Sequence, residues 1–282
     1  MIELAFLILF PAIVAFLLLA FKNGQVRNVV VKIAAGLIGL ATIILLITYF
    51  SSGLVLFSVH LETAAEIMFV ISLLIAGFIL YLGIKQRKYL AVILVTIQTL
   101  MFIGIEGWLA KDVQQVSNLF IDQFSLIMAA IVGIIGTLIC VYALAYMETY
   151  HAHHPEIPDR QNVFFFMVFV FLAAMFGLIF SNNLLWVYFF WEITTLASFI
   201  LIGYSKTAES TNNAFLALEM NLLGGIAFAG AIIYLLIADP TGSFLGIEQL
   251  LSSGQALALV PAVLISFAGI TKAALMPFSS WL

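Results

Sequence analysis

Nine apolar stretches of about 20 residues follow one another along the chain, and they constrain its fold more than any other feature. A helix needs about 20 apolar residues to cross the hydrocarbon core of a bilayer. Barrel strands would alternate in polarity, which these stretches do not, so helices are expected. The expected spans cover 2–21, 28–50, 62–82, 89–109, 124–147, 163–180, 183–204, 213–237 and 256–280. The sequence therefore predicts an all-α, polytopic membrane protein.

The composition excludes a water-soluble domain, because 65% of the residues are hydrophobic and only 9% are charged. The single cysteine, Cys140, excludes an internal disulfide and an iron–sulfur cluster held by this chain alone. The sequence has no glycine-rich nucleotide loop, and the HAHH run at 151–154 is interpreted as an incidental loop sequence. We therefore expect neither a cofactor nor a metal in this chain, and no nucleic acid partner.

Basic residues predict the orientation of the spans. Eight lysines and arginines follow odd-numbered spans, whereas only Lys111 follows an even-numbered one. Because basic loops stay on the cytoplasmic side, we expect a multi-pass protein of the cytoplasmic (inner) membrane whose N-terminus faces outward. The segment 113–122 is expected to lie as an amphipathic helix at the outer surface.

One carboxylate, Glu192, stands in the middle of the apolar run WVYFFWEITTLASFILIGY. Its position nine residues into the seventh span places it roughly 13 Å deep, where a charge costs about 2.5–3.5 kcal/mol. Tyr188, Thr195 and Ser198 share its helical face, so one polar stripe should face other helices or internal water. The pattern favours a proton relay or ion pathway. The alternative is a protonated glutamate that links helices by hydrogen bonds.

One lysine, Lys272, falls inside the ninth span beside Thr271. Pro261, Pro277 and Gly269 surround it, and this combination predicts a kinked or broken helix. Broken helices in membranes occur where the backbone lines a cavity or an ion site. The alternative is a lysine that snorkels to the membrane surface near a span end.

Glu192 and Lys272 are therefore expected to form a buried pair of opposite, titratable groups. Burial penalises the charged form of each, and proximity of the two charges offsets that penalty. Such a pair titrates as a coupled unit and can act as a switch if one partner moves. A second carboxylate, Glu219, lies about two turns into the eighth span and is a supporting candidate.

The same residues carry a family resemblance, which extends from about Phe120 to Leu282. The motifs are FIDQFSLIMAAIVGIIGTLICVYALAYM, then NNLLWVYFFWEITTLASFILIGY, and last ITKAALMPFSSWL. This part of the chain resembles the antiporter-like subunits of respiratory complex I, of the Mrp sodium/proton antiporters and of energy-converting membrane hydrogenases. The first four spans resemble the family only in being hydrophobic.

The resemblance implies a fold of two inverted five-helix repeats, each with a broken helix that bears a key lysine. It also implies that Glu192 and Lys272 form the charge pair of the first half-channel. The chain departs from the family in reading TKAAL where TKSAQ is common, which removes two polar groups beside Lys272. Because the family continues beyond WL, we expect an N-terminal part, with four helices in 1–110 and an incomplete first repeat in 111–282.

The leading functional hypothesis is a proton-translocating subunit of a complex I-like or hydrogenase-type redox complex. Its redox cofactors would lie in partner subunits, and this chain would have no redox centre of its own. The first alternative is an Mrp-type sodium/proton antiporter subunit, and the second is a membrane scaffold without transport. In each case the expected surroundings are the lipid bilayer and other membrane subunits, and the transported ion is H⁺, with Na⁺ as the alternative.

Overall fold

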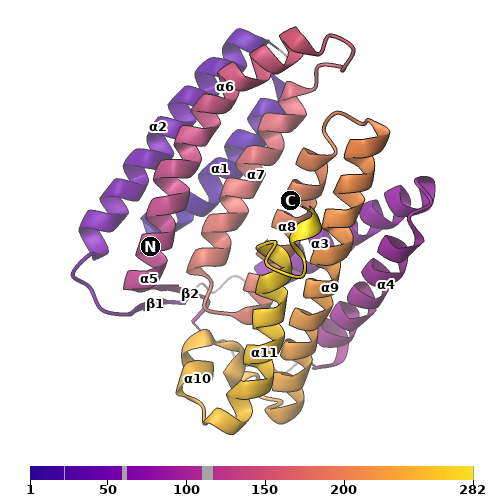
Figure 1. Cartoon of the computed structure of the whole chain (residues 1–282). Coiled ribbons are helices and arrows are strands. Elements are labelled where there is room, and N and C mark those ends of the chain that lie inside the picture. The colour runs from indigo at the N-terminus through magenta and orange to yellow at the C-terminus, as the bar shows by residue number, and fades with distance from the viewer. Residues whose placement is uncertain (22, 59–61, 110–116, 282) are drawn as a thin grey trace.

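The computed structural model describes residues 1–21, 23–58, 62–109 and 117–281, and long helices dominate it (Figure 1). In chain order these are α1 (Ile2–Ala20), α2 (Gly24–Tyr49), α3 (Glu62–Lys85), α4 (Tyr89–Gly104), α5 (Gln123–Ala130), α6 (Gly136–His153), α7 (Gln161–Phe180), α8 (Leu184–Ile202), α9 (Ala208–Ala238), the short α10 (Ile247–Ser252) and α11 (Gln255–Lys272). A π-helical turn, Ile131–Ile135, joins α5 to α6 in one continuous helix. Within the described residues, eight helices are long and apolar enough to cross a membrane, and α11 is a shorter ninth. The predicted polytopic α-helical class is confirmed.

The ninth helix differs from its predicted extent of 256–280, because α11 ends at Lys272. Pro277 explains the early end, since a proline in a helix clashes with the carbonyl four residues before it, here that of Ala273. The chain then turns, with Ala274 at a φ of 52°, and forms a short 3₁₀ helix, Ser279–Trp281. The Trp281 indole N–H donates to the Thr271 carbonyl at 3.2 Å, which ties this segment back to the end of α11.

Two short strands form a small antiparallel sheet in the described part of the chain. β1 (Val55–Phe57) pairs antiparallel with β2 (Leu119–Ile121), with Val55 opposite Ile121. The predicted amphipathic helix over 113–122 is therefore wrong where the structure describes it, and 113–116 lie outside the described residues. Leu119 and Ile121 are buried on one side of β2, which is the alternation a strand produces. The α3–α4 hairpin lies between the two strands in sequence.

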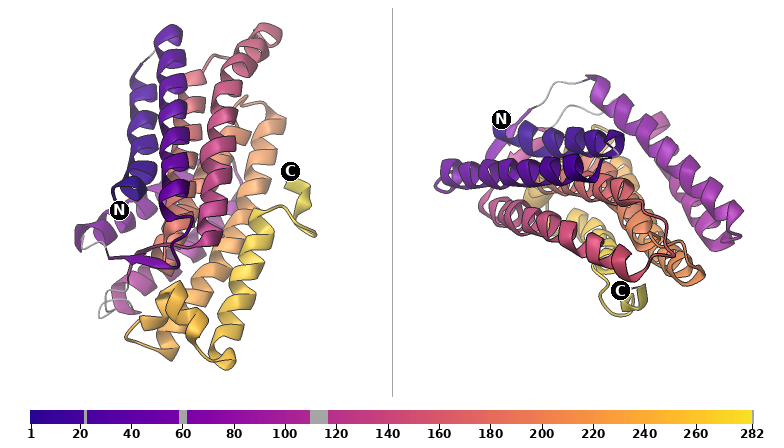
Figure 2. Two further views of the ribbon diagram at one scale, coloured as in Figure 1. Left: turned by 90° about the vertical axis from the view of Figure 1, so that its left-hand side faces the viewer. Right: turned by 90° about the horizontal axis from the view of Figure 1, so that it is seen from above.

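Helices α7, α8 and α9 form the centre of the molecule. α1 packs along α7, α7 along α8, α8 along α9, and α11 along α9, while α3 and α4 form a hairpin on the outside (Figure 2). The phenylalanines of α7 fill the contact with α1, and Phe165, Phe169, Phe176 and Phe180 are all fully buried. Glu192 therefore lies on a central helix, α8, and Lys272 lies on α11, which packs against the central helix α9.

A glycine lets α11 approach α9 closely. A Cβ on Gly224 would lie 2.1 Å from the Thr271 hydroxyl oxygen and 3.3 Å from the Ala268 backbone. Small residues allow this close approach between membrane helices. The contact fixes the end of α11, and with it Lys272, against the central helices.

Large apolar side chains cover the outward faces of the peripheral helices. Ile47 on α2, Phe124 on α5 and Tyr142 on α6 are 76%, 70% and 69% exposed. Such faces suit lipid or other membrane subunits rather than water. The outward-facing N-terminus remains a prediction.

Candidate functional site

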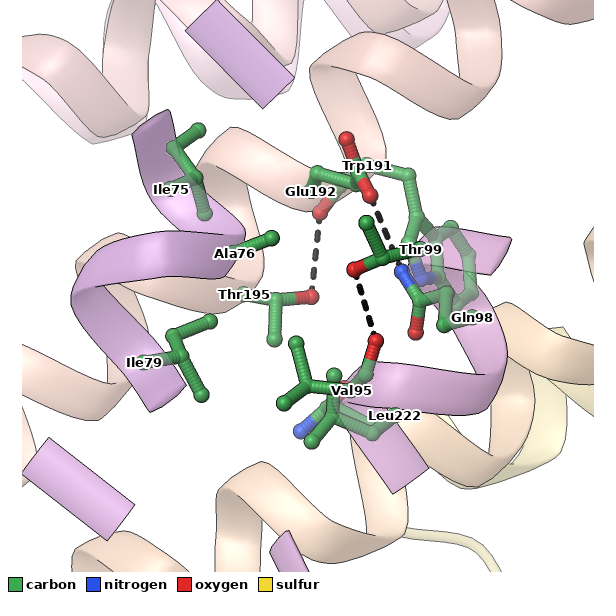
Figure 3. Close-up of a pocket in the computed structure, with 11 residues that line it drawn as sticks. Ile75, Ala76, Ile79, Val95, Gln98, Thr99, Trp191, Glu192, Thr195 and Leu222 are labelled. Carbon is green, nitrogen blue, oxygen red and sulfur yellow. Dashed lines mark hydrogen bonds between the residues drawn. The ribbon is translucent and has the colours of Figure 1, made fainter. Parts of the chain in front are cut away.

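The Glu192 carboxylate lies near the middle of α8 and accepts hydrogen bonds from two other helices, of which Figure 3 shows the one from Gln98. The Ser72 hydroxyl of α3 donates to one carboxylate oxygen at 2.5 Å. The Gln98 amide Nε2 of α4 donates to the other oxygen at 3.0 Å. Each carboxylate oxygen thus accepts a hydrogen bond, which offsets part of the cost of burying a charge there.

Ser72 and Gln98 are functional-site candidates that the sequence analysis missed. Both are almost fully buried, with 2% and 5% exposure, in helices outside the region of family resemblance. The sequence did contain an indication for Gln98, because it is the only amide in the apolar run YLAVILVTIQTLMFIGI. A buried amide needs partners, so its position in a membrane span already indicated a polar contact.

Lys272 is the last residue of α11, and its side chain turns toward α8. The ammonium Nζ donates to the Thr195 hydroxyl at 2.6 Å and lies 3.4 Å from the Trp191 carbonyl oxygen. It also sits over the Trp191 ring, 5.1 Å from the ring centroid. These contacts direct the lysine into the helix group, unlike the snorkelling alternative.

Thr195 connects the two charged groups. Within the described part of the chain, Lys272 forms no salt bridge with Glu192 or with any other carboxylate. Instead, the Thr195 hydroxyl that accepts from Lys272 lines the same small cavity as Glu192. The Thr195 proton is donated to the Trp191 carbonyl at 3.0 Å. The Thr195 hydroxyl thus contacts Lys272 directly and lines the cavity beside Glu192, so one small side chain stands between the two titratable groups.

The other predicted residues contribute differently. Tyr188 is fully buried next to Phe102 and Phe228, and its hydroxyl lies close to the side chains of Glu192 and Gln98. Ser198 donates to the Thr194 carbonyl of its own helix at 2.9 Å. Thr271 likewise donates to the Ala268 carbonyl at 2.7 Å.

Glu219 lies outside the group around Glu192. It is partly buried on α9 and interacts with Lys88 and with the backbone of Ala91, at the start of α4. The structure therefore brings together Glu192, Thr195 and Lys272, with Tyr188 beside them, and leaves Ser198, Thr271 and Glu219 apart. Among the described residues, no three histidine, cysteine, aspartate or glutamate side chains form a metal-binding cluster.

Gly225 leaves room for the Gln98 amide, which gives a testable consequence. A Cβ at this position would lie 2.6 Å from Gln98 Oε1 and 2.9 Å from its Cδ. The Gly225→Ala substitution should therefore displace the Gln98 amide and disturb its hydrogen bond to Glu192. Because the end of a flexible side chain can move, we expect little loss of stability and about a threefold to tenfold loss of ion transport, equivalent to about 1 kcal/mol for one hydrogen bond.

The matched control is Gly230→Ala on the same helix, where the nearest atom to a new Cβ is a Leu264 methyl at 3.9 Å. Both substitutions add the same helix propensity, so that effect cancels. Transport by the reconstituted complex and its thermal unfolding temperature are the measurements. Equal transport by the two variants would show that the Gln98 contact does not matter.

Two family models match this chain, and together they cover more than half of it. One, described as "NADH-Ubiquinone oxidoreductase (complex I), chain 5 N-terminus", matches residues 108–156. The other, described as "NADH:quinone oxidoreductase/Mrp antiporter, TM", matches residues 181–282 and so includes Glu192 and Lys272. Ser72 and Gln98 lie before both matches.

Curated relatives and one solved structure are similar over part of the chain. A Na⁺/H⁺ antiporter subunit from Alkalihalophilus pseudofirmus is 33% identical over 58% of this chain and 20% of its own length. A probable K⁺/H⁺ antiporter subunit from Rhizobium meliloti is 34% identical over 58% of this chain and 16% of its own length. The Mrp complex from Dietzia sp. DQ12-45-1b matches 77% of this chain and 24% of its own, with 24% identity and a TM-score of 0.49.

The matches thus cover a fifth or less of these curated relatives. The two family models match residues 108–156 and 181–282, and the second of these ranges holds the glutamate and the lysine. The chain belongs to the family of antiporter-like membrane subunits that respiratory complex I and the Mrp antiporters share.

Proposed function

We propose that this chain is an ion-translocating subunit of an Mrp-type complex, which exchanges a monovalent cation for protons across the membrane. The observation that carries the proposal is the placement of two titratable groups, Glu192 and Lys272: Lys272 donates to Thr195, and Thr195 and Glu192 line one cavity. The relatives named as Na⁺/H⁺ and K⁺/H⁺ antiporter subunits favour exchange over the redox-driven pump that the sequence alone favoured.

The chemistry follows from the two titratable groups. Glu192 takes up a proton at a depth where a fixed charge is costly, and Ser72 and Gln98 hold its carboxylate in place. Lys272 holds or releases a proton on the other side of Thr195. Because the charge of each group affects the other, the pair titrates as a unit, and ion movement past one group is linked to proton movement at the other.

Other membrane subunits are the proposed partners. The exposed apolar faces of the peripheral helices support contacts with lipid and with such subunits. The chain would have no redox centre of its own. The outward N-terminus is part of the proposal and rests on the charge bias of the loops.

The test uses the whole complex, purified through a tag on this chain and reconstituted into proteoliposomes with a preformed pH gradient. We expect added Na⁺ or K⁺ to dissipate the gradient without any electron donor, and separate Na⁺ and K⁺ arms identify the cation. Proton movement that requires an electron donor and does not depend on Na⁺ or K⁺ would instead support the redox-driven pump. If the complex moves no ions, and removal of this chain affects only its assembly, the scaffold alternative is supported.

A further inference from the structure

The cavity beside Glu192 has the size of a single small occupant. It lies between α3, α4, α8 and α9 and has a volume of about 20 Å³ (Figure 3). A cavity of about 10–15 Å³ already holds one water molecule, so one water-sized species fits. Its polar lining comes from Gln98, Thr99, Glu192, Thr195 and Asn221.

Two amide oxygens in this lining lack partners. Gln98 and Asn221 are 5% and 2% exposed, and among the described residues neither Gln98 Oε1 nor Asn221 Oδ1 has a hydrogen-bond partner. The amide nitrogens are already committed, because Gln98 donates to Glu192 at 3.0 Å and Asn221 donates to the Ala217 carbonyl at 2.7 Å. The Glu192 carboxylate and the Ala217 carbonyl both accept hydrogen bonds, so each amide turns its NH₂ group toward its acceptor. The oxygen of each amide therefore points away from that acceptor. Buried acceptors left unpaired are costly and call for an occupant.

The two oxygens approach the same part of α9. Gln98 Oε1 lies against Gly225, where an added Cβ would come within 2.6 Å of it. Asn221 stands four residues earlier, one turn away on the same face of α9. Both oxygens thus belong to residues that lie on or against the same face of α9 and line the cavity together with Glu192.

We propose that this cavity is the binding site of a dehydrated alkali cation, with Gln98 Oε1, Asn221 Oδ1 and the Glu192 carboxylate as ligands. Hard cations prefer such carbonyl and carboxylate oxygens. This inference rests on the proposed cation exchange and assigns the place where the cation binds. Lys272, which reaches the cavity through Thr195, repels the bound ion, so cation occupancy and the Lys272 charge oppose each other.

The experiment measures KM for Na⁺ and for K⁺ in the reconstituted whole complex. Asn221→Leu removes a ligand oxygen and should raise KM about tenfold or more with little change in the turnover rate at saturating cation. Asn221→Asp keeps the shape and adds negative charge, so KM should fall. Asn212→Leu and Asn212→Asp, at an exposed position of the same helix that accepts from Lys88, are the matched controls and should leave KM unchanged.

The opposite signs at Asn221 distinguish a cation site from a water site or a packing contact. A KM raised by Asn221→Asp as well, or unchanged in both variants, overturns the inference. If the leucine variant fails to assemble, the aspartate variant decides alone: a lower KM supports the site, and an unchanged or raised KM overturns it. A wild-type complex that exchanges no cation would overturn the proposed function itself, whereas exchange by the wild type with an unchanged KM in the variants overturns only this site.

Discussion

Replacing Glu192 with glutamine is expected to lower cation–proton exchange by the reconstituted complex at least about 100-fold, while the complex still assembles. The amide has nearly the shape of the carboxylate but neither binds nor releases a proton in the physiological range. Its two partners can reverse their roles. The Ser72 hydroxyl can accept as well as donate, and the Gln98 amide can rotate to present its oxygen. Because the polar contacts survive, the loss of exchange can be attributed to the loss of proton binding at residue 192.

The matched control is Glu219→Gln, which removes a partly buried carboxylate from α9 outside the group around Glu192. We expect its exchange rate to stay within about threefold of the wild-type rate, since the change leaves the pair intact. Exchange is followed by the decay of a pH gradient, and assembly by co-purification of the other subunits. Normal exchange by Glu192→Gln would show that this carboxylate is not part of the proton pathway. A loss of assembly confined to Glu192→Gln would support the scaffold alternative.

The positions of the helices could be predicted from the sequence because the length of an apolar run is set by the thickness of a bilayer. Every predicted span has a helix in the structure. The length of an apolar run, however, says little about the residue at which a helix ends. The end of α11 depended on one residue, Pro277, whose ring conflicts with a helix around Ala273. The strand Leu119–Ile121 forms only by pairing with Val55–Phe57, which a local pattern does not reveal.

The site was predictable in part, because residue type and depth single out Glu192 and Lys272. The residues that hold Glu192 come from elsewhere in the sequence, 120 residues away for Ser72 and 94 for Gln98. Helix periodicity cannot report such packing. It also overestimated the polar stripe, since the Ser198 hydroxyl bonds a carbonyl of its own helix. Serine and threonine commonly do this in helices, so sharing a face with Glu192 did not place Ser198 in the site.

Replacing Lys272 with methionine is the second large effect, and we expect exchange to fall about 10- to 100-fold. Methionine keeps the length of the side chain and removes the titratable group. The Thr195 hydroxyl keeps its bond to the Trp191 carbonyl at 3.0 Å, so the change leaves no unpaired donor there. Lys85→Met, at an exposed position at the end of α3, is the matched control and should exchange at the wild-type rate.

An arginine at the same position separates charge from proton release. Arginine keeps the positive charge but does not release a proton in proteins, so Lys272→Arg should restore little exchange if Lys272 hands a proton across Thr195. Recovery to near the wild-type rate would mean that a fixed positive charge is enough. The double variant with Glu192→Gln adds a further criterion, because groups that act as one unit have non-additive effects. The double variant should therefore exchange no more slowly than Glu192→Gln alone. If its loss of exchange instead equals the product of the two single losses, the two groups serve separate pathways.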